Sequence, residues 1–350
     1  MAEKVVSEIG GGRYGISRGI KKSDLEKFAI DPKTQLIQIA EPLSEKEVEL
    51  LESIVFSKRS DIQFRVYAHY NQVCNLTFLE RIPSLRKLLI NCILDATGIE
   101  SICKLKNIEL IGVDIFNLDN FDFLNKLNPF IRELHLGETK SKKPKIDSIA
   151  RFSDLKILYL EGQQNGIEVI NQLKNLEEIT LRSISTSNID YIKGLQKLWS
   201  VDVKLGGIKN FEALTSLPNL KYLELWQVRD LSDLSFISKL TTLQHLYIQS
   251  LKQLKQLPDF SNCHSLRRIY LENLKGLTEL GSLKTAPNLE EFIYVLAQSQ
   301  APEKLIPALE NSIVKRVCCR FGSDKKNNLF DELAAKYGKE QYRYTEFIYK

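Results

Sequence analysis

The sequence lacks long hydrophobic runs and closely paired cysteines. No stretch of about eighteen residues passes without charge or strong polarity, and the start carries no apolar run of signal-peptide length, so neither a membrane span nor a secretory signal is expected. The six cysteines among 350 residues show no C-x-x-C spacing and are too dilute for a disulfide scaffold. We therefore expect a protein of the reducing cytoplasm.

An excess of one charge is also missing. The 49 Lys and Arg residues nearly balance the 44 Asp and Glu residues, and the net charge of +5 is spread along the chain. A nucleic-acid binder would concentrate its basic residues in one stripe, so nucleic acid is not an expected partner. With 43% hydrophobic residues and only ten prolines, the chain has enough apolar material for an extensive core and does not resemble a disordered protein.

Motifs of catalysis, metal binding and cofactor binding are absent as well. The four histidines, at positions 69, 135, 245 and 264, form no H-E-x-x-H pattern, so no metal site is expected. Glycines at positions 10–12 are not followed by G-K-[ST], and we interpret this segment as a flexible leader rather than a phosphate loop. No nucleophile, base and orienting residue can be placed together from spacing. The sequence thus predicts neither an enzyme nor a bound cofactor.

What the sequence does contain is one apolar pattern that recurs along the chain: an apolar residue, two free positions, apolar, two free, apolar, one free, apolar. Weaker copies flank the clean ones on both sides, and the last apolar position recurs twelve times between positions 66 and 319, every 21 to 25 residues. The clean copies are Phe152/Leu155/Leu158/Leu160, Leu173/Leu176/Ile179/Leu181, Leu195/Leu198/Val201/Val203, Leu217/Leu220/Leu223/Leu225 and Leu240/Leu243/Leu246/Ile248.

This pattern resembles the leucine-rich repeat family, whose L-x-x-L-x-L core forms a strand followed by a return segment. Units such as "LPNLKYLELWQVRDLSDLSFISKL" look like bacterial internalin repeats, and "LKQLKQLPDFSNCHSLRRIYLENLKGL" is similar to plant immune-receptor repeats. The resemblance implies an α/β fold, a curved horseshoe-shaped solenoid with a parallel concave sheet of about twelve strands over residues 61–320. The family often places Asn three residues after the strand. Here an apolar spine is expected instead, formed by Ile93, Phe116, Ile184, Val228, Leu251 and Leu274.

Both ends of such a stack need covers, because an exposed repeat leaves its apolar face in water. Residues 1–60 are expected to form a leader and cap, with a strand at 36–39 and a helix that begins after Ser44 and carries Glu47 at the capping-box position. Residues 321–350 are expected to form the other cap. In it, a helix from about Ser323 to Tyr337 ends at Gly338, and a final strand at 342–349 closes the edge of the sheet.

The free positions within each strand should form the open concave face of the sheet, because side chains alternate along a strand. Three positions per strand give about 36 slots, in which 13 Tyr and 2 Trp among 350 residues would place about 1.5 by chance. Six such residues occur there, and none of the 16 phenylalanines does. Aromatic rings with polar tips favour interfaces, although they could also simply cover the sheet. The six are Tyr67, Tyr159, Tyr222, Trp226, Tyr247 and Tyr270.

The same face is predicted to be acidic at its centre, which suits a basic protein surface and repels phosphates. We therefore expect a monomeric, non-enzymatic module that binds a protein on its concave face and has no nucleic-acid or membrane partner. Adaptor, immunity-protein and effector roles fit equally. The alternative is an enzyme whose repeats only recruit substrate. The expected protein-binding residues are Tyr159, Tyr222, Glu224, Trp226, His245, Tyr247, Arg268, Tyr270 and Glu272.

Overall fold

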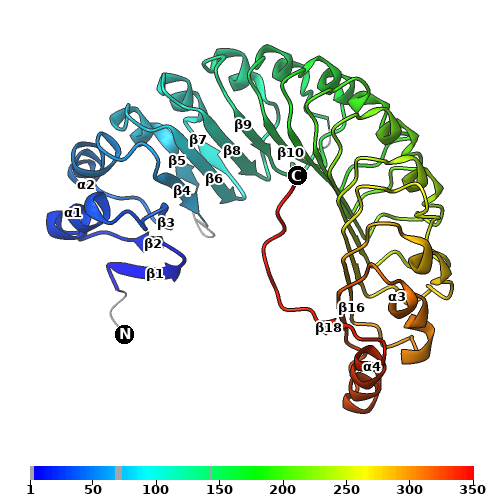
Figure 1. Cartoon of the computed structure of the whole chain (residues 1–350). Helices are drawn as coiled ribbons and strands as arrows, with labels where there is room; N and C mark the ends of the chain where they lie inside the picture. The colour runs from blue at the N-terminus through cyan, green and yellow to red at the C-terminus, as the bar shows by residue number, and fades with distance from the viewer. Residues whose placement is uncertain (1–3, 68–72, 142) are drawn as a thin grey trace. The chain divides into compact units, whose positions relative to one another are not determined.

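The computed structural model describes residues 4–67, 73–141 and 143–350, so the histidine at position 69, one of the four considered above, lies outside the described residues. The chain divides into two compact units, Met1–Leu173 and Lys174–Lys350. Within each unit, short strands alternate with short helical segments, and successive strands pair side by side (Figure 1). Among the described residues, no helix has the length and apolar character needed to cross a membrane.

The first unit contains a sheet in the order β1-β2-β3-β4-β6-β8-β9-β10 and a separate pair, β5-β7. Its pairs are parallel except for the antiparallel hairpin of β1 and β2. The strands are β1 (Val6–Gly10), β2 (Arg13–Ile16), β3 (Leu36–Ile39), β4 (Gln63–Tyr67), β5 (Cys74–Asn75), β6 (Lys87–Ile93), β7 (Ala96–Thr97), β8 (Leu110–Ile115), β9 (Glu133–Leu136) and β10 (Ile157–Glu161). The helices are α1 (Lys22–Ile30), α2 (Glu45–Leu50), a π-helical turn (Leu51–Phe56) and 3₁₀ helices at Leu76–Arg81, Ile99–Lys104, Asp122–Lys126, Asp147–Arg151 and Ile167–Gln172.

The second unit contains eight parallel strands in chain order, from β11 to β18. They are β11 (Glu178–Arg182), β12 (Ser200–Lys204), β13 (Tyr222–Trp226), β14 (His245–Gln249), β15 (Arg268–Glu272), β16 (Glu291–Val295), β17 (Arg316–Cys319) and β18 (Glu340–Gln341). The helices are 3₁₀ segments at Asp190–Ile192, Glu212–Ser216, Ser235–Lys239, Gly281–Thr285 and Pro302–Leu305, together with α3 (Ile306–Glu310) and α4 (Asp324–Lys336).

The repeat pattern is confirmed as the core of both units. All twenty apolar residues of the five clean copies are buried, with at most 4% of any of them exposed. Each of the twelve last apolar positions lies in one of the strands β4, β6 and β8–β17. Inward side chains of neighbouring strands therefore stack on one another, which supplies the burial that no single repeat could provide.

The turn that follows each of the strands β11 to β16 uses a backbone conformation that L-residues rarely adopt. Ser183, Leu205, Gln227, Ser250, Asn273 and Leu296 all have φ between 50° and 57°. The N–H of Leu205 donates to Trp226 O at 2.9 Å and that of Gln227 to Gln249 O at 2.8 Å, so the turns are joined by backbone bonds. The expected apolar spine lies beside them: Ile184, Val228, Leu251 and Leu274 are buried. In the first unit, however, Phe116 is 39% exposed and does not join a spine.

At the N-terminus, the expected strand and capped helix are confirmed. β3 covers the residues predicted, and the Ser44 hydroxyl and the Glu47 carboxylate form the reciprocal bonds of a capping box. The expected flexible leader is wrong, because β1 and β2 form a hairpin around Gly10–Gly12. Gly12 has a φ of 74°, and a Cβ there would lie 1.9 Å from the carbonyl oxygen of Lys33. The three glycines therefore serve a tight turn against the neighbouring loop.

At the C-terminus, the helix is confirmed and the final strand is wrong. α4 begins after Ser323, whose hydroxyl accepts a bond from the Lys326 N–H, and Gly338 follows its last turn with a φ of 68°. Strand pairing with β17 stops after Glu340 and Gln341. Residues 342–350, here called the tail, leave the edge of the sheet (Figure 1). Only two residues at that edge are paired, because the tail crosses the strands instead of extending β18.

Candidate functional site

The strand register of the second unit places eight of the nine expected site residues together. The open face, meaning the sheet face that carries the residues alternating with the core, shows three rows across β13, β14 and β15. The first row is Tyr222, His245 and Arg268; the second row is Glu224, Tyr247 and Tyr270; the third row is Trp226, Gln249 and Glu272. This arrangement matches the predicted alignment. Tyr159, the ninth residue, lies on β10 in the first unit, where its hydroxyl donates to Glu161 at 2.8 Å.

A shared hydrogen-bond network holds the second and third rows. The Tyr247 hydroxyl lies 2.8 Å from Glu272 and 2.9 Å from Gln249, and the Gln249 amide donates to Glu272 at 3.0 Å. The rings of Tyr247 and Tyr270 lie 4.9 Å apart and are tilted by 45°. Burial and the bond to Glu272 raise the pKa of Tyr247 well above its usual range. The bonds to Gln249 and Glu272 therefore hold Tyr247 in one orientation, and its ring packs against that of Tyr270.

An acidic group lies beside the rows on β12 and β13. Lys204 Nζ is 3.3 Å from Asp202 and 3.3 Å from Glu224, so one cation serves two carboxylates. Burial, with the neighbouring Glu224 carboxylate, raises the pKa of Asp202 to about 6. The buried Asp202 Oδ1 accepts no hydrogen bond among the described residues. This group has an unused acceptor and an excess of negative charge, both of which suit a basic side chain.

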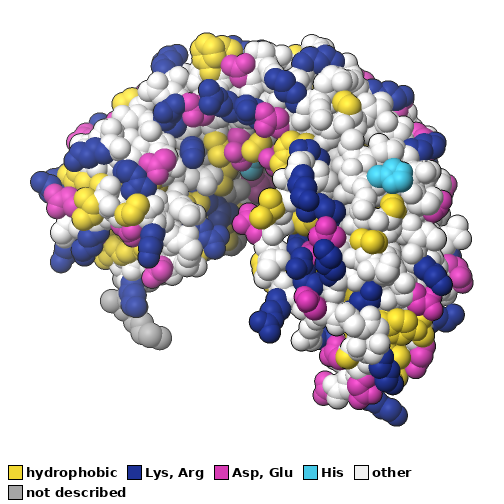
Figure 2. Space-filling view, viewed as in Figure 1, with side chains coloured by type: hydrophobic (Ala, Val, Ile, Leu, Met, Phe, Trp, Pro, Cys, Tyr) yellow, Lys and Arg dark blue, Asp and Glu magenta, His cyan; other side chains and the backbone are white. Residues whose placement is uncertain are grey.

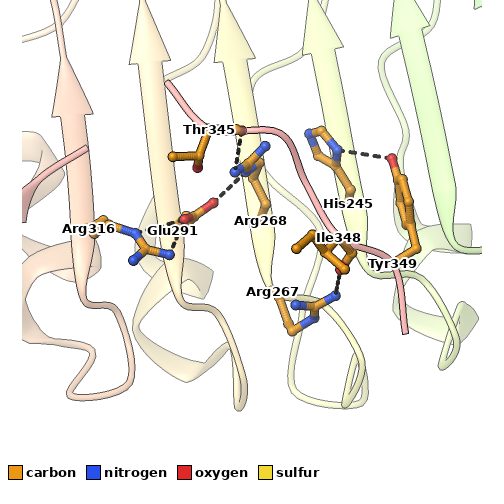
Figure 3. A network of polar contacts seen from close by, with 8 residues as sticks. All are labelled: His245, Arg267, Arg268, Glu291, Arg316, Thr345, Ile348 and Tyr349. Atoms are coloured by element: carbon orange, nitrogen blue, oxygen red, sulfur yellow. Dashed lines mark hydrogen bonds and ion pairs between the residues drawn. The ribbon is translucent and has the colours of Figure 1, made fainter. Parts of the chain in front are cut away.

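The tail covers the first row. It runs over β15 and β14 toward β13, and Figure 3 shows Thr345 beside Arg268, and Tyr349 beside His245. The His245 Nδ1 is 3.4 Å from the Tyr349 hydroxyl, and the Phe347 ring lies 5.0 Å from the His245 ring. The first row is consequently occupied by the protein's own chain. In the part of the chain that the structure describes, the hydrogen bonds among Tyr247, Gln249 and Glu272 involve no tail residue.

Arg268, the third member of the first row, is also part of an ion-pair chain. Its Nε donates to Glu291 at 2.5 Å, and Arg316 donates to the other oxygen of the same carboxylate from its Nε at 2.8 Å (Figure 3). The Arg268 side chain is only 7% exposed and that of Glu291 only 5%. The interpretation of Arg268 as an accessible binding residue therefore needs correction, because Glu291 and the tail cover it. Its outer nitrogen donates to Thr345 O, and its guanidinium lies 4.9 Å from the ring centre of Phe347 and 5.3 Å from that of Tyr342.

His245 is held in its neutral form. Burial, and to a smaller extent the Arg268 cation, lowers the pKa of His245 to about 3. The groups that face it are Tyr222 from β13, Arg268 from β15, and Phe347 and Tyr349 from the tail. Its Nε2 is buried and has no hydrogen-bond partner among the described residues. A buried nitrogen without a partner costs about 1–3 kcal/mol, so the covered state of this row is not optimal.

We expect acid to weaken the folded second unit through His245. Between pH 3 and 6.5, His245 is protonated in the unfolded chain and neutral in the folded chain. The free energy of unfolding therefore falls as the pH drops below 6.5. At pH 5 the expected loss of unfolding free energy is about 2 kcal/mol, because each pH unit between 6.5 and 5 contributes about 1.36 kcal/mol. Asp202 acts in the opposite direction, because its raised pKa favours protonation of the folded chain. Urea unfolding of wild type and His245→Gln at pH 7 and pH 5 isolates the histidine, since Asp202 is common to both. Equal pH dependence of the two chains would refute the expectation.

Three contributors to this site were not expected from the sequence. Trp199, Gln244 and Arg267 each immediately precede a strand, outside the three positions counted as the open face. All three contact the tail: the Trp199 ring lies 5.1 Å from that of Tyr349, and Gln244 and Arg267 bond to its backbone. The sequence signal that could have found them was the alternation of Phe347 and Tyr349 in the tail, which was predicted to be an edge strand.

Charges on the visible surface are mixed. Figure 2 shows Lys and Arg side chains interspersed with Asp and Glu side chains, and no broad region of one sign dominates that view. Among the described residues, no group of three or more His, Cys, Asp or Glu side chains is placed to hold a metal ion.

Comparison with known proteins identifies the fold. An internalin, InlF, from Listeria monocytogenes str. 4b F2365 is 17% identical, with a TM-score of 0.56 over 80% of this chain and 77% of that chain. The chain therefore has the leucine-rich repeat fold. A leucine-rich repeat protein from Leptospira interrogans is 14% identical over 93% of this chain and 100% of that chain, with a TM-score of 0.48. Internalin InlC2 from the same Listeria strain is 14% identical over 78% and 91%, with a TM-score of 0.34. No protein-family model matches the chain, and no curated protein matches it.

Proposed function

We propose that the protein is a binding module without catalytic activity, and that it recognises another protein on the open face of the second unit. The observation that carries the proposal is the set of oriented aromatic side chains on that face, with Tyr247 and Tyr270 in ring contact and Tyr247 held by Glu272. Tyr and Trp dominate the binding energy of protein interfaces, because they combine a large apolar body with a polar tip.

The partner we propose presents basic side chains near these rings. Asp202 and Glu224 share the single cation Lys204, and Asp202 keeps an unbonded buried oxygen. A Lys or Arg of the partner that reached this oxygen would gain a charge-assisted bond, which is stronger than a neutral one. Adaptor, immunity-protein and effector roles would all use such a surface.

The test is to remove the aromatic rings of the open face and to measure how tightly the partner still binds. Trp226→Ala, Tyr247→Ala and Tyr270→Ala should each weaken a true partner by about 2 kcal/mol, which corresponds to roughly thirty-fold in Kd. Wild type and the triple variant serve as bait in an extract of the source cells, captured proteins are identified by mass spectrometry, and their affinities are measured by calorimetry.

The matched control is Tyr67→Ala, a tyrosine on the open-face side of β4 in the first unit, where Arg65 packs over its ring at 4.3 Å. This variant should bind the partner as tightly as wild type does. A folded triple variant that binds the partner as tightly as wild type would contradict the proposal. Circular dichroism of each variant separates lost binding from lost folding, the result expected if the rings merely stabilise the sheet.

A further inference from the structure

The tail is bound in the manner of an extended peptide ligand. Its last five side chains alternate: Phe347 and Tyr349 face the sheet and are half-buried, whereas the intervening Ile348 is 77% exposed. This period of two is that of a strand. The Tyr342 N–H still donates to Val317 O of β17 at 2.8 Å, and the tail then runs across the sheet. The first row and the residues preceding the strands therefore contact the side chains of Phe347 and Tyr349 and leave that of Ile348 in solvent.

Side chains of the sheet bind the backbone of the tail. Thr345 O accepts from Arg268 at 3.3 Å, and Ile348 O accepts from Arg267 at 2.6 Å. At Lys350, both backbone groups bond to one amide: its carbonyl accepts from Gln244 Nε2 at 2.8 Å, and its N–H donates to Gln244 Oε1 at 2.9 Å. Backbone contacts of this kind recognise an extended conformation, and they do not depend on which side chains the segment carries.

Specificity then comes from two aromatic positions. Phe347 packs under two guanidinium groups, with its ring centre 4.6 Å from Arg267 and 4.9 Å from Arg268. Tyr349 contacts the rings of Trp199 at 5.1 Å and Tyr222 at 6.4 Å, and the two tail rings touch each other at 4.8 Å. Cation–π and ring contacts contribute about 0.5–2 kcal/mol each, so these two positions favour aromatic residues over others.

We propose that the first row, together with Trp199, Gln244 and Arg267, is a binding site for an extended protein segment with two aromatic side chains two residues apart, and that the tail is its intramolecular occupant. The inference rests on the proposed function and specifies the partner. The partner carries an aromatic-x-aromatic segment, and this segment displaces the tail. The unbonded Nε2 of His245 is a position where a displacing segment can form a hydrogen bond that the tail does not provide.

The experiment uses the full chain and a labelled synthetic peptide with the sequence of residues 342–350. Phe347→Ala/Tyr349→Ala in the chain removes the rings of the tail but leaves the sheet unchanged. A tethered tail competes at an effective concentration of roughly millimolar, so the peptide should bind this double variant at least ten-fold more tightly than wild type in fluorescence anisotropy. A peptide in which the same two aromatics are Ala should bind at least ten-fold more weakly.

The matched control adds Arg267→Ala to the double variant. Among the described residues, the polar and ring contacts of the Arg267 side chain are with Gln244 and the tail. Its loss should therefore weaken binding of the peptide at least ten-fold while circular dichroism stays unchanged. Equal affinity of the peptide for wild type and double variant, or no binding to either, would overturn the inference. A wild-type dimer in solution that the double variant lacks would overturn the intramolecular assignment. The proposed function would survive these results if the Trp226, Tyr247 and Tyr270 variants still lost the captured partner.

Discussion

Leu246→Ala is expected to lower the free energy of unfolding by about 2–5 kcal/mol. Leu246 is fully buried on β14, in register with Leu223 on one side and Ile269 on the other. Its removal costs the transfer free energy of the lost carbons and leaves a cavity between strands whose backbones are fixed by pairing. Chemical denaturation followed by circular dichroism measures the change.

The control for this experiment is Thr241→Ala, an exposed position that precedes the same strand. A surface substitution of this kind should stay within about 0.5 kcal/mol of wild type. Leu223→Ala, one strand away and equally buried, should repeat the large loss. If Leu246→Ala cost less than about 0.5 kcal/mol, the assignment of this position to the core would be wrong.

Glu291→Gln is expected to destabilise the second unit by about 3–5 kcal/mol. The Glu291 carboxylate is the shared acceptor of Arg268 and Arg316, and it is nearly inaccessible to water. Without its charge, the buried Arg268 guanidinium keeps its desolvation cost and loses the attraction that offsets it. Urea unfolding at pH 7 measures the loss.

Arg316→Gln is the matched control, because it removes the more exposed of the two arginines that pair with Glu291. The Arg316 side chain is 41% exposed, so water can replace part of what it loses, and the cost should be about 1 kcal/mol or less. Similar losses for the two variants would show that burial of the Arg268–Glu291 pair does not determine its contribution. Replacing both partners together, as Arg268→Met/Glu291→Leu, should cost less than Glu291→Gln alone, because no buried charge is left unpaired and the freed Arg316 is exposed to water.

Spacing along the sequence was sufficient to predict the repeats and the rows. Leu246 occupies the same position in its repeat as Leu223 does in the one before, and a one-residue error in this alignment would have moved every leucine to the wrong face. The alignment of Tyr222, His245 and Arg268 follows from the same count and is confirmed by the strand pairing. The capping box at Ser44 and Glu47 was equally predictable, because it depends on contacts three residues apart.

The path of the tail could not be predicted in this way. Its alternation of aromatic residues is compatible both with an edge strand and with a segment that crosses the sheet. The choice depends on contacts such as Gln244 with Lys350, which are 106 positions apart in the chain. The burial of Arg268 likewise depends on Glu291 and on the tail, and no local pattern indicates it. The hairpin at Gly12 was missed because it packs against a loop without a recognisable motif: the Gly12 carbonyl accepts from the Gln35 N–H at 2.8 Å, and the Lys33 carbonyl leaves no room for a Cβ at Gly12.

The tail also changes how the second unit can come apart. In a stack of repeats each strand touches only its neighbours, so an end can fray one repeat at a time. Here the residues that follow β18 contact Gln244 before β14, Arg267 before β15 and Trp199 before β12. The C-terminal end of the stack is therefore tied to repeats in the middle of the unit. Fraying from the C-terminal end must first break these contacts. A pulling force applied at Lys350 would therefore load Gln244 and Arg267 in the interior of the stack before it reached α4 and β17.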